Sequence, residues 1–95
     1  MTRSEIERIL QEKKTFLADY YHVKRIGLFG SYVRDEQTDE SDIDLLVEFS
    51  KPVGLEFIDL KFYLEELLQK PVDLVTPNAL KPLIREDIMS EVQFQ

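Results

Sequence analysis

The sequence predicts a small α/β (α+β) domain in which helices pack on one face of a mixed β-sheet. Apolar residues recur at helical spacing in three segments, and three shorter apolar segments among them have the length and alternation of strands. The helical segments are 4–21, 55–68 and 80–90, and the strand segments are 24–29, 42–49 and 72–76. A short connection between the first two strands predicts an antiparallel pair, whereas the helical crossover before the third predicts that it runs parallel to the second.

Chain length and composition limit what this domain can be. The 95 residues form one domain, residues 1–95, which can bury roughly 60 to 70 per cent of its unfolded surface around a single core. There is no apolar run of about 18 residues and no signal segment, so we expect no membrane contact and a cytoplasmic location. The absence of cysteine excludes disulfides, thiolate metal sites and cysteine nucleophiles.

The charge distribution argues against nucleic acid as the main partner. The formal net charge is −7, and the twelve basic residues are scattered along the chain. A nucleic-acid groove needs a basic footprint, because neutralised phosphates supply most of its affinity. A small nucleotide delivered with Mg²⁺ largely avoids this objection, since the metal carries the compensating charge.

The first and last helical segments have recognisable starts. Ser4 followed by Glu7 has the form of a capping box, and an apolar stripe then continues to about Tyr21. In the last segment, Pro82 is compatible only with the first helical turn. The residues after that segment, 92–95, are candidates for a short edge strand.

The residues that follow the first strand are candidates for binding phosphate. Gly30 allows a turn after the strand, and Ser31 can cap a short helix that carries Arg34. Backbone N–H groups at the start of a helix bind anions, and the Ser31 hydroxyl adds a donor. Arg34 could assist the phosphate, but an exposed ion pair with Asp35 or Glu36 is about as well supported by the sequence.

Two acids one residue apart open the central strand, and they are candidate metal ligands. Alternation along a strand places Asp42 and Asp44 on one face and Ile43 on the other. Two like charges so close raise each other's proton affinity, and a hard divalent cation such as Mg²⁺ compensates such a pair. A calcium loop that starts at Asp35 is excluded, because its sixth position is Glu40 where glycine is needed.

The strand arrangement brings a third acid to the same end of the sheet. The exit of the first strand at Gly30 lies beside the entry of the second at Asp42, because the two strands are antiparallel neighbours. The third strand runs parallel to the second, so its entry, which carries Asp73, falls at this end as well. An exposed residue on an edge strand is the alternative interpretation of Asp73.

Taken separately, a Gly-Ser turn and an Asp-x-Asp pair are typical of ordinary turns and strands, but their combination at this spacing is much more specific. It is similar to the signature of the DNA polymerase β-like nucleotidyltransferase superfamily. Within that superfamily, the chain resembles the minimal nucleotidyltransferases, the MNT-domain antitoxins that occur beside HEPN-domain toxins. The blocks that carry the resemblance are Gly30–Arg34, Ser41–Phe49 and Val72–Thr76, and the similarity extends over nearly the whole chain.

The resemblance implies the polymerase β-like fold, with the sheet order 1-2-3, helices on one face and the site on the other. It also implies a Mg²⁺-dependent enzyme that transfers AMP from ATP to a hydroxyl, such as that of a tyrosine, on a partner HEPN toxin. The chain would then be the antitoxin in a hetero-oligomer. In this scheme Asp42, Asp44 and Asp73 are the catalytic and metal-binding acids of a two-metal site, and Gly30, Ser31 and Arg34 bind the nucleotide.

Two alternative functions stay open at this stage. A non-catalytic antitoxin would neutralise its partner by occlusion, with a vestigial metal site, although retention of all three acids favours the enzyme. Transfer to a small molecule such as an aminoglycoside is less favoured, because the family members that do this usually carry an additional helical domain. The sequence leaves the acceptor residue, the number of nucleotides transferred and the nucleobase undetermined.

Overall fold

The central sheet of the computed structural model, which describes residues 1–95, has four strands in the order β3-β2-β1-β4. The strands are β1 (Val23–Phe29), β2 (Ile43–Phe49), β3 (Val72–Val75) and β4 (Gln93–Phe94). β1 runs antiparallel to both β2 and β4, whereas β2 runs parallel to β3. The predicted mixed sheet is therefore confirmed, and the short edge strand expected near the end of the chain pairs with β1.

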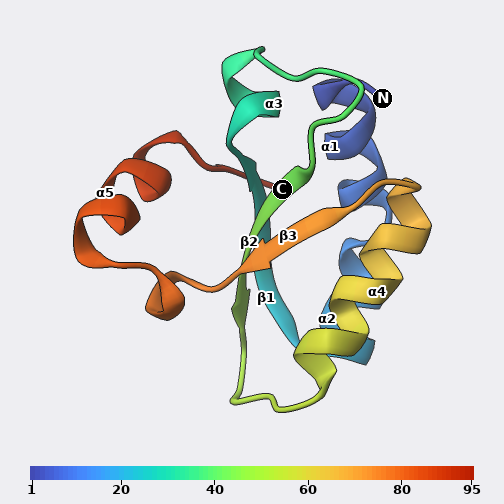
Figure 1. The fold of residues 1–95 in the computed structure, drawn as a ribbon. Helices are drawn as coiled ribbons and strands as arrows, with labels where there is room; N and C mark the ends of the chain where they lie inside the picture. The colour runs from blue at the N-terminus through green and yellow to red at the C-terminus, as the bar shows by residue number, and fades with distance from the viewer.

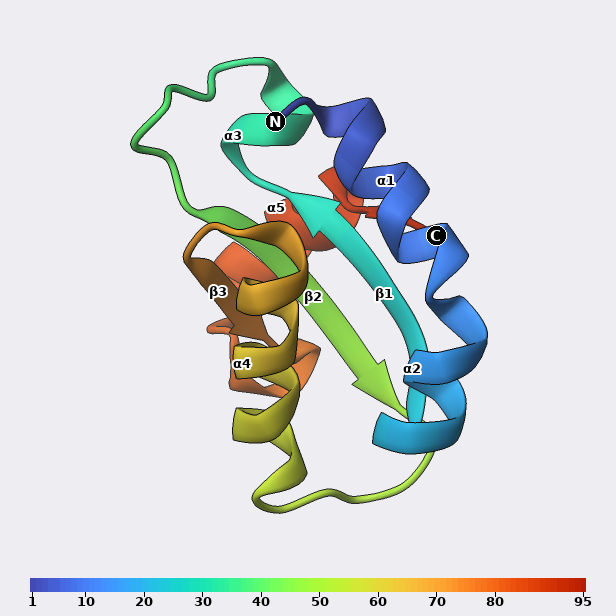
Figure 2. The same cartoon turned by 90° about the vertical axis from the view of Figure 1, so that its right-hand side faces the viewer.

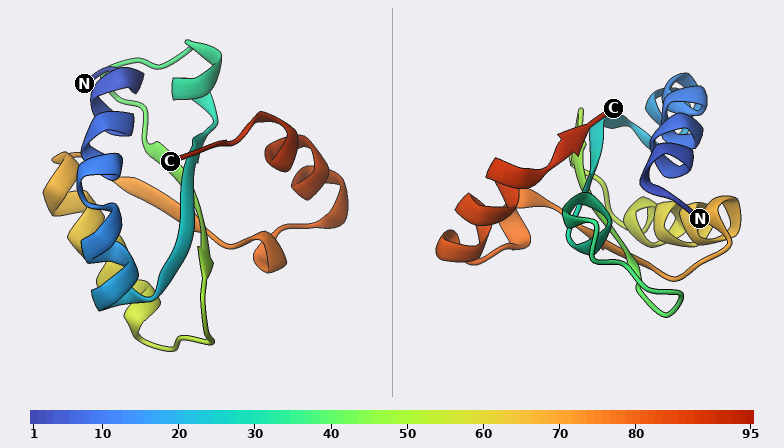
Figure 3. Two further views of the ribbon diagram at one scale, coloured as in Figure 1. Left: turned by 180° about the vertical axis from the view of Figure 1, so that it is seen from behind. Right: turned by 90° about the horizontal axis from the view of Figure 1, so that it is seen from above.

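The helices lie on both sides of this sheet. They are α1 (Arg3–Glu12), α2 (Lys14–Tyr21), α3 (Ser31–Arg34), α4 (Glu56–Leu68) and α5 (Pro82–Glu91), with a 3₁₀ turn η1 (Pro77–Ala79) before α5. As predicted, α1, α2 and α4 share one face of the sheet (Figures 1 and 2). The view from above in Figure 3 shows α5 beyond the opposite face. The expectation that the helices share one face is therefore wrong for α5, whose following segment pairs with β1. None of the helices has the length and apolar character that a membrane span requires.

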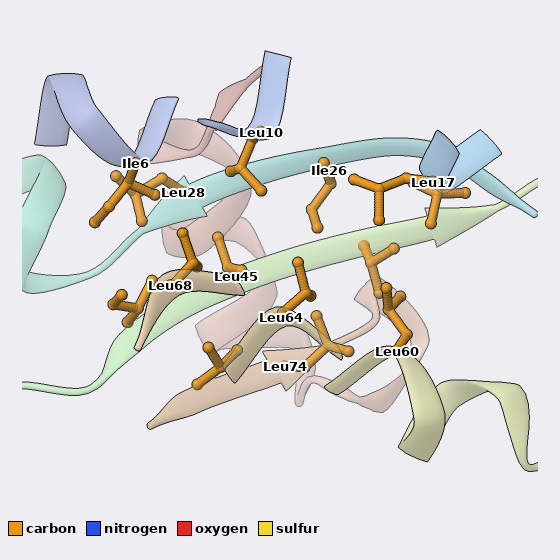
Figure 4. Packing of buried hydrophobic residues seen from close by; sticks show 14 of the residues in the cluster. Ile6, Leu10, Leu17, Ile26, Leu28, Leu45, Leu60, Leu64, Leu68 and Leu74 are labelled. Carbon is orange, nitrogen blue, oxygen red and sulfur yellow. The ribbon is translucent and has the colours of Figure 1, made fainter. Parts of the chain in front are cut away.

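The core fills the space between the sheet and the helices α1, α2 and α4. Leucine and isoleucine side chains of these helices meet alternate residues of β1, β2 and β3 (Figure 4). The buried cluster comprises Ile6, Leu10, Leu17, Tyr21, Val23, Ile26, Leu28, Tyr32, Ile43, Leu45, Val47, Leu60, Leu64, Leu68, Val72 and Leu74. Because burial of one such side chain contributes about 1.5 to 3 kcal/mol, this cluster holds the strands in the register that positions the polar residues of the other face.

The first helix begins earlier than the sequence predicted. Its cap is Thr2, whose hydroxyl accepts the Glu5 N–H at 3.2 Å while the Glu5 carboxylate accepts the Thr2 N–H at 3.2 Å. The expected pair of Ser4 and Glu7 is wrong, because Ser4 already lies inside the first turn. The helix therefore begins with a capping box, as predicted, but the box starts two residues earlier.

The single first helix expected up to Tyr21 is divided at Lys13, which has φ −97° and ψ 5° and ends α1 before α2 begins. Leu10 and Leu17 on either side of the break are buried. Phe16 and Tyr20, which belong to the predicted apolar stripe, are instead 42% and 65% exposed, and their rings stack on each other. The stripe therefore identified the helix but not all of its core residues.

β4 packs closely against the middle of β1. Gly27 and Leu28 pair with Phe94 and Gln93, and a Cβ atom at Gly27 would lie 2.7 Å from Cγ2 of Val92. A glycine is therefore needed there for the segment after α5 to cross the sheet. α5 starts at Pro82, two residues later than the predicted segment, and Pro82 lies in its first turn as expected. The helix contributes no buried residue.

Candidate functional site

The strand register places the candidate residues in one row at one end of the sheet. Phe29, the residue before the Gly30 turn, pairs with Asp44 across β1 and β2. Asp44 in turn pairs with Asp73 across β2 and β3. Since neighbouring strands lie about 4.8 Å apart, the turn and the two carboxylates are adjacent. The expected meeting of the first strand's exit with the entries of the other two is confirmed.

Asp44 occupies the centre of this row, and its surroundings disfavour its negative charge. It is half-buried, whereas Asp42, which precedes the first residue of β2, and Asp73 are exposed. Burial, together with the negative charges of Asp73, Asp42 and Glu91, raises the pKa of Asp44 to about 6, although the positive charge of Arg34 lowers it. The site therefore has an excess of negative charge that nothing in the chain neutralises fully.

Gly30 shapes the turn and brings it against Asp44. Its φ of 76° lies in the region that side chains with a Cβ rarely adopt. A Cβ atom there would collide with Oδ2 of Asp44 and lie 2.9 Å from its Cγ. The backbone of the turn can approach the carboxylate this closely only because residue 30 is a glycine. Ser31 follows as the first residue of α3 and is half-buried, so its predicted role as the helix cap is wrong, because Gly30 occupies the cap position.

The donors of the turn are engaged by a residue far away in the sequence. The Gly30 N–H donates to Oε1 of Glu91 at 2.9 Å, and Nη1 of Arg34 donates to both carboxylate oxygens of Glu91 at 3.1 Å. Nε of Arg34 also donates to Glu36 at 2.6 Å. The exposed ion pair with Glu36 considered for Arg34 is thus present, and a second acid shares the same guanidinium.

Sequence reasoning missed Glu91, the last residue of α5. The antiparallel pairs Gly27 with Phe94 and Leu28 with Gln93 continue by extrapolation to Gly30 opposite Glu91. Pairing of the predicted edge strand with the first strand would have been the signal. Without that pairing, nothing in the sequence distinguishes Glu91 from the other acids of the last helical segment.

A broad hollow of the surface lies elsewhere. It measures about 810 Å³ and is lined by Lys24 of β1 and by residues from the C-terminal ends of β2 and β3 and the loops that follow, among them Phe49, Lys51, Thr76 and Asn78. The row of acids lies at the opposite ends of these strands. The candidate acids and this hollow are therefore separate features of the chain, and the acids are not among the residues that line the hollow.

The acids have the donor chemistry that Mg²⁺ requires. No group of three or more His, Asp or Glu side chains is positioned to hold a metal ion. However, Mg²⁺ usually takes one or two protein carboxylates and completes its shell with phosphate oxygens and water. Asp42 and Asp44 offer such a pair, and a cation there would relieve the repulsion that raises the pKa of Asp44. The residues fit a metal brought in with a nucleotide.

Comparison with known families identifies the kind of enzyme to which this geometry belongs. A family model described as "Nucleotidyltransferase domain" matches residues 4–94. The chain belongs to the nucleotidyltransferase domain family. This nucleotidyltransferase is 45% identical over 95 residues to "Protein adenylyltransferase MntA" of Thermococcus cleftensis, covering 99% of this chain and 96% of the relative. It is also 48% identical over 95 residues to "Putative protein adenylyltransferase MJ0128" of Methanocaldococcus jannaschii, covering 98% and 97%.

Solved structures agree with this membership. "Structure of putative minimal nucleotidyltransferase" superposes with a TM-score of 0.75 and 34% identity, covering 96% of this chain and 89% of that one. "Crystal structure of the toxin-antitoxin with AMP-PNP" gives 0.70 and 22%, covering 99% and 72%. A tri-AMPylated Shewanella oneidensis HEPN toxin in complex with MNT antitoxin gives 0.66 and 21%, covering 94% and 70%. The minimal nucleotidyltransferase fold expected from the motifs is confirmed, and at these lower identities the complexes show the fold alone.

Proposed function

We propose that this nucleotidyltransferase transfers AMP from ATP to a hydroxyl, that of a tyrosine, on a HEPN-domain toxin, and that it acts as the antitoxin of this partner. The observation that carries the proposal is the row formed by the Gly30 turn, Asp44 and Asp73 at one end of the sheet. Two relatives at 45% and 48% identity are named as protein adenylyltransferases. The choice of partner is supported by the AMPylated HEPN toxin in the similar complex.

Each residue of the row has a role in this proposal. The Gly30 N–H, the Ser31 hydroxyl and Arg34 would donate to phosphate oxygens and hold the triphosphate. Asp42 and Asp44 would hold Mg²⁺, which would neutralise charge on the α-phosphate during in-line displacement. Asp73 would either hold a second ion or act as the base toward the acceptor hydroxyl. The open surface at the acids suits a protein hydroxyl better than a small acceptor, because a protein brings its own contacts.

Asp73 is the residue that would prepare the acceptor. As an exposed carboxylate on the edge strand, it can reach a hydroxyl that approaches from outside. The hydroxyl oxygen forms a bond to the α-phosphorus, the bond from that phosphorus to the β-bridging oxygen breaks, and pyrophosphate leaves with the electron pair. Where Asp73 acts as the base, it accepts the hydroxyl proton.

The proposal is tested by mass spectrometry of the HEPN partner after incubation with this protein, ATP and Mg²⁺. We expect the partner's mass to rise by whole AMP units, and its inhibition to persist after the two proteins are separated. Asp73→Asn should lose transfer by at least about a hundredfold while it retains most of the ATP affinity.

Neutralisation by occlusion makes the opposite prediction. If wild type and Asp73→Asn silence the partner equally, without a mass change and without ATP, the protein acts as a binding module. Calorimetric titration with ATP distinguishes a lost acceptor step from a lost nucleotide site, since only the second abolishes ATP binding.

A further inference from the structure

The carboxylate of Glu91 lies where the proposed function requires phosphate. It accepts three hydrogen bonds, one from the Gly30 N–H at 2.9 Å and two from Nη1 of Arg34 at 3.1 Å. A carboxylate and a phosphate are both anionic acceptors with oxygens that a guanidinium can bind in pairs. The two groups therefore compete for the same donors.

The position of Glu91 is otherwise unfavourable. It adds a carboxylate to a site that already holds Asp44, Asp42 and Asp73, with Arg34 as the cation that acts on Asp44. Like charges at this distance repel, so the donors of the turn must compensate for the repulsion. The contact shows that Gly30 and Arg34 attract an anion even in this acidic surrounding.

The Glu91 contact, defined by the bonds from Gly30 and Arg34, can be opened without disturbing the fold. The Arg34 side chain is 52% exposed and that of Glu91 is 25% exposed, so water can solvate the guanidinium when the contact opens. α5 contributes no residue to the buried core. Val92, the next residue, is held against Gly27, so the Glu91 side chain can leave while β4 remains paired.

We propose that Glu91 is a built-in competitor of nucleotide, which must vacate Gly30 and Arg34 before the triphosphate can bind. The inference rests on the proposed function, because it assigns these donors to phosphate. Competition lowers the apparent affinity by the fraction of molecules in which the donors are free. If the contact is formed in about 80 to 90 per cent of molecules, its removal tightens binding about five- to tenfold.

The test is calorimetric titration of AMP-PNP with Mg²⁺ into wild type and three variants. Glu91→Gln removes the charge that pairs with Arg34, and should bind about five- to tenfold more tightly. Glu91→Asp keeps the charge but shortens the side chain by one methylene, and should bind at least about threefold more tightly. Glu86→Gln, on an exposed position of the same helix, makes the same change in net charge and should bind as wild type does. Circular dichroism checks that all variants are folded.

Each outcome has one meaning. Unchanged or weaker binding by Glu91→Gln overturns the inference, with weaker binding assigning Glu91 to the nucleotide site itself. If Glu91→Asp binds as wild type does while Glu91→Gln binds more tightly, general charge repulsion explains the gain and the competition is refuted. Absence of AMP-PNP binding in every variant, wild type included, overturns the proposed nucleotide site as well.

A second readout follows the Gly30 amide directly. In the wild type without nucleotide, its N–H is bonded to Glu91, so Glu91→Gln should move the Gly30 amide resonance and speed its hydrogen exchange. With AMP-PNP and Mg²⁺ bound, wild type and variant should give the same resonance, because phosphate then accepts the bond in both. Resonances that still differ in the bound state would show that Glu91 stays in place, contrary to the proposal.

Discussion

Asp44 is the residue of the site whose negative charge is most disfavoured by its surroundings. Its carboxylate lies half-buried between Phe29 and Asp73 in the strand register. The same burial and crowding that raise its pKa to about 6 make the metal-free protein less stable whenever Asp44 is ionised. A residue that we propose as a metal ligand therefore reduces the stability of the metal-free fold.

The pH dependence of this effect has a definite sign. Between about pH 4 and pH 6 the folded state holds a proton that the unfolded state has released, so stability falls as the pH rises through this window. A shift of about two units corresponds to at most about 3 kcal/mol, and we expect about 1 to 2 kcal/mol because Asp44 is partly exposed. Asp44→Asn should therefore stabilise the metal-free protein by that amount at pH 7 and by almost nothing at pH 4.

Urea denaturation in the presence of EDTA at both pH values measures this difference. Equal stability of wild type and Asp44→Asn at pH 7 would contradict the assignment of an unfavourable charge to Asp44. The same substitution should abolish the binding of Mg²⁺ and ATP, since it removes a carboxylate proposed to hold the metal.

Gly30 and Ser31 make separable contributions to the proposed phosphate contacts. Gly30→Ala forces a Cβ atom against the Asp44 carboxylate and strains a φ of 76°, so the turn must move. Ser31→Ala deletes one hydroxyl donor, worth about 0.5 to 1.5 kcal/mol. We expect ATP affinity to fall more than tenfold for the first and about two- to tenfold for the second, measured by calorimetry. The reverse order would mean that the backbone of the turn does not hold phosphate.

At the scale of the elements, the packing of β4 on β1 depends on Gly27. A Cβ atom there would lie 2.7 Å from Cγ2 of Val92 and 2.9 Å from the carbonyl oxygen of Gln93. Gly27→Ala should cost about 1 to 3 kcal/mol of unfolding free energy and speed exchange of the Gln95 amide, which donates to Ile26. Gly54→Ala is the matched control, because its nearest neighbour would lie 3.9 Å away, and it should leave stability unchanged or slightly raised.

The elements also show how far the sequence alone can be followed. The acids of β2 and β3 could be predicted because apolar alternation and the connections between successive strands can be read directly from the sequence. A helical crossover makes β3 parallel to β2, and Asp44 accordingly lies next to Asp73. Lys13 interrupts the apolar stripe at the residue where the first helix divides, but the aliphatic stem of a lysine can lie along an apolar face, so the interruption did not predict a break. The side of the sheet occupied by α5 depends on the pairing of β4 with β1, which joins residues far apart in the chain. Glu91 was missed for that reason.

At the scale of the whole molecule, stability is concentrated in one of the two layers that cover the sheet. Leu64 of α4 is fully buried, whereas Leu83 of α5 is 82% exposed. Leu64→Ala should cost about 2 to 5 kcal/mol because it leaves a cavity in the core, whereas Leu83→Ala should change stability by less than about 0.5 kcal/mol. Thermal or urea denaturation of the two variants measures this contrast, and a similar loss in both would show that α5 belongs to the core.

Every member of the buried cluster lies between Ile6 and Leu74, and α5 adds none to it. Substitutions in α5 therefore cost little folding free energy, even though the helix ends at the residue that contacts the site. A combinatorial library randomised over the exposed positions of α5 should consist mostly of folded proteins. Variants with altered nucleotide affinity could then be selected from it without a parallel selection for stability.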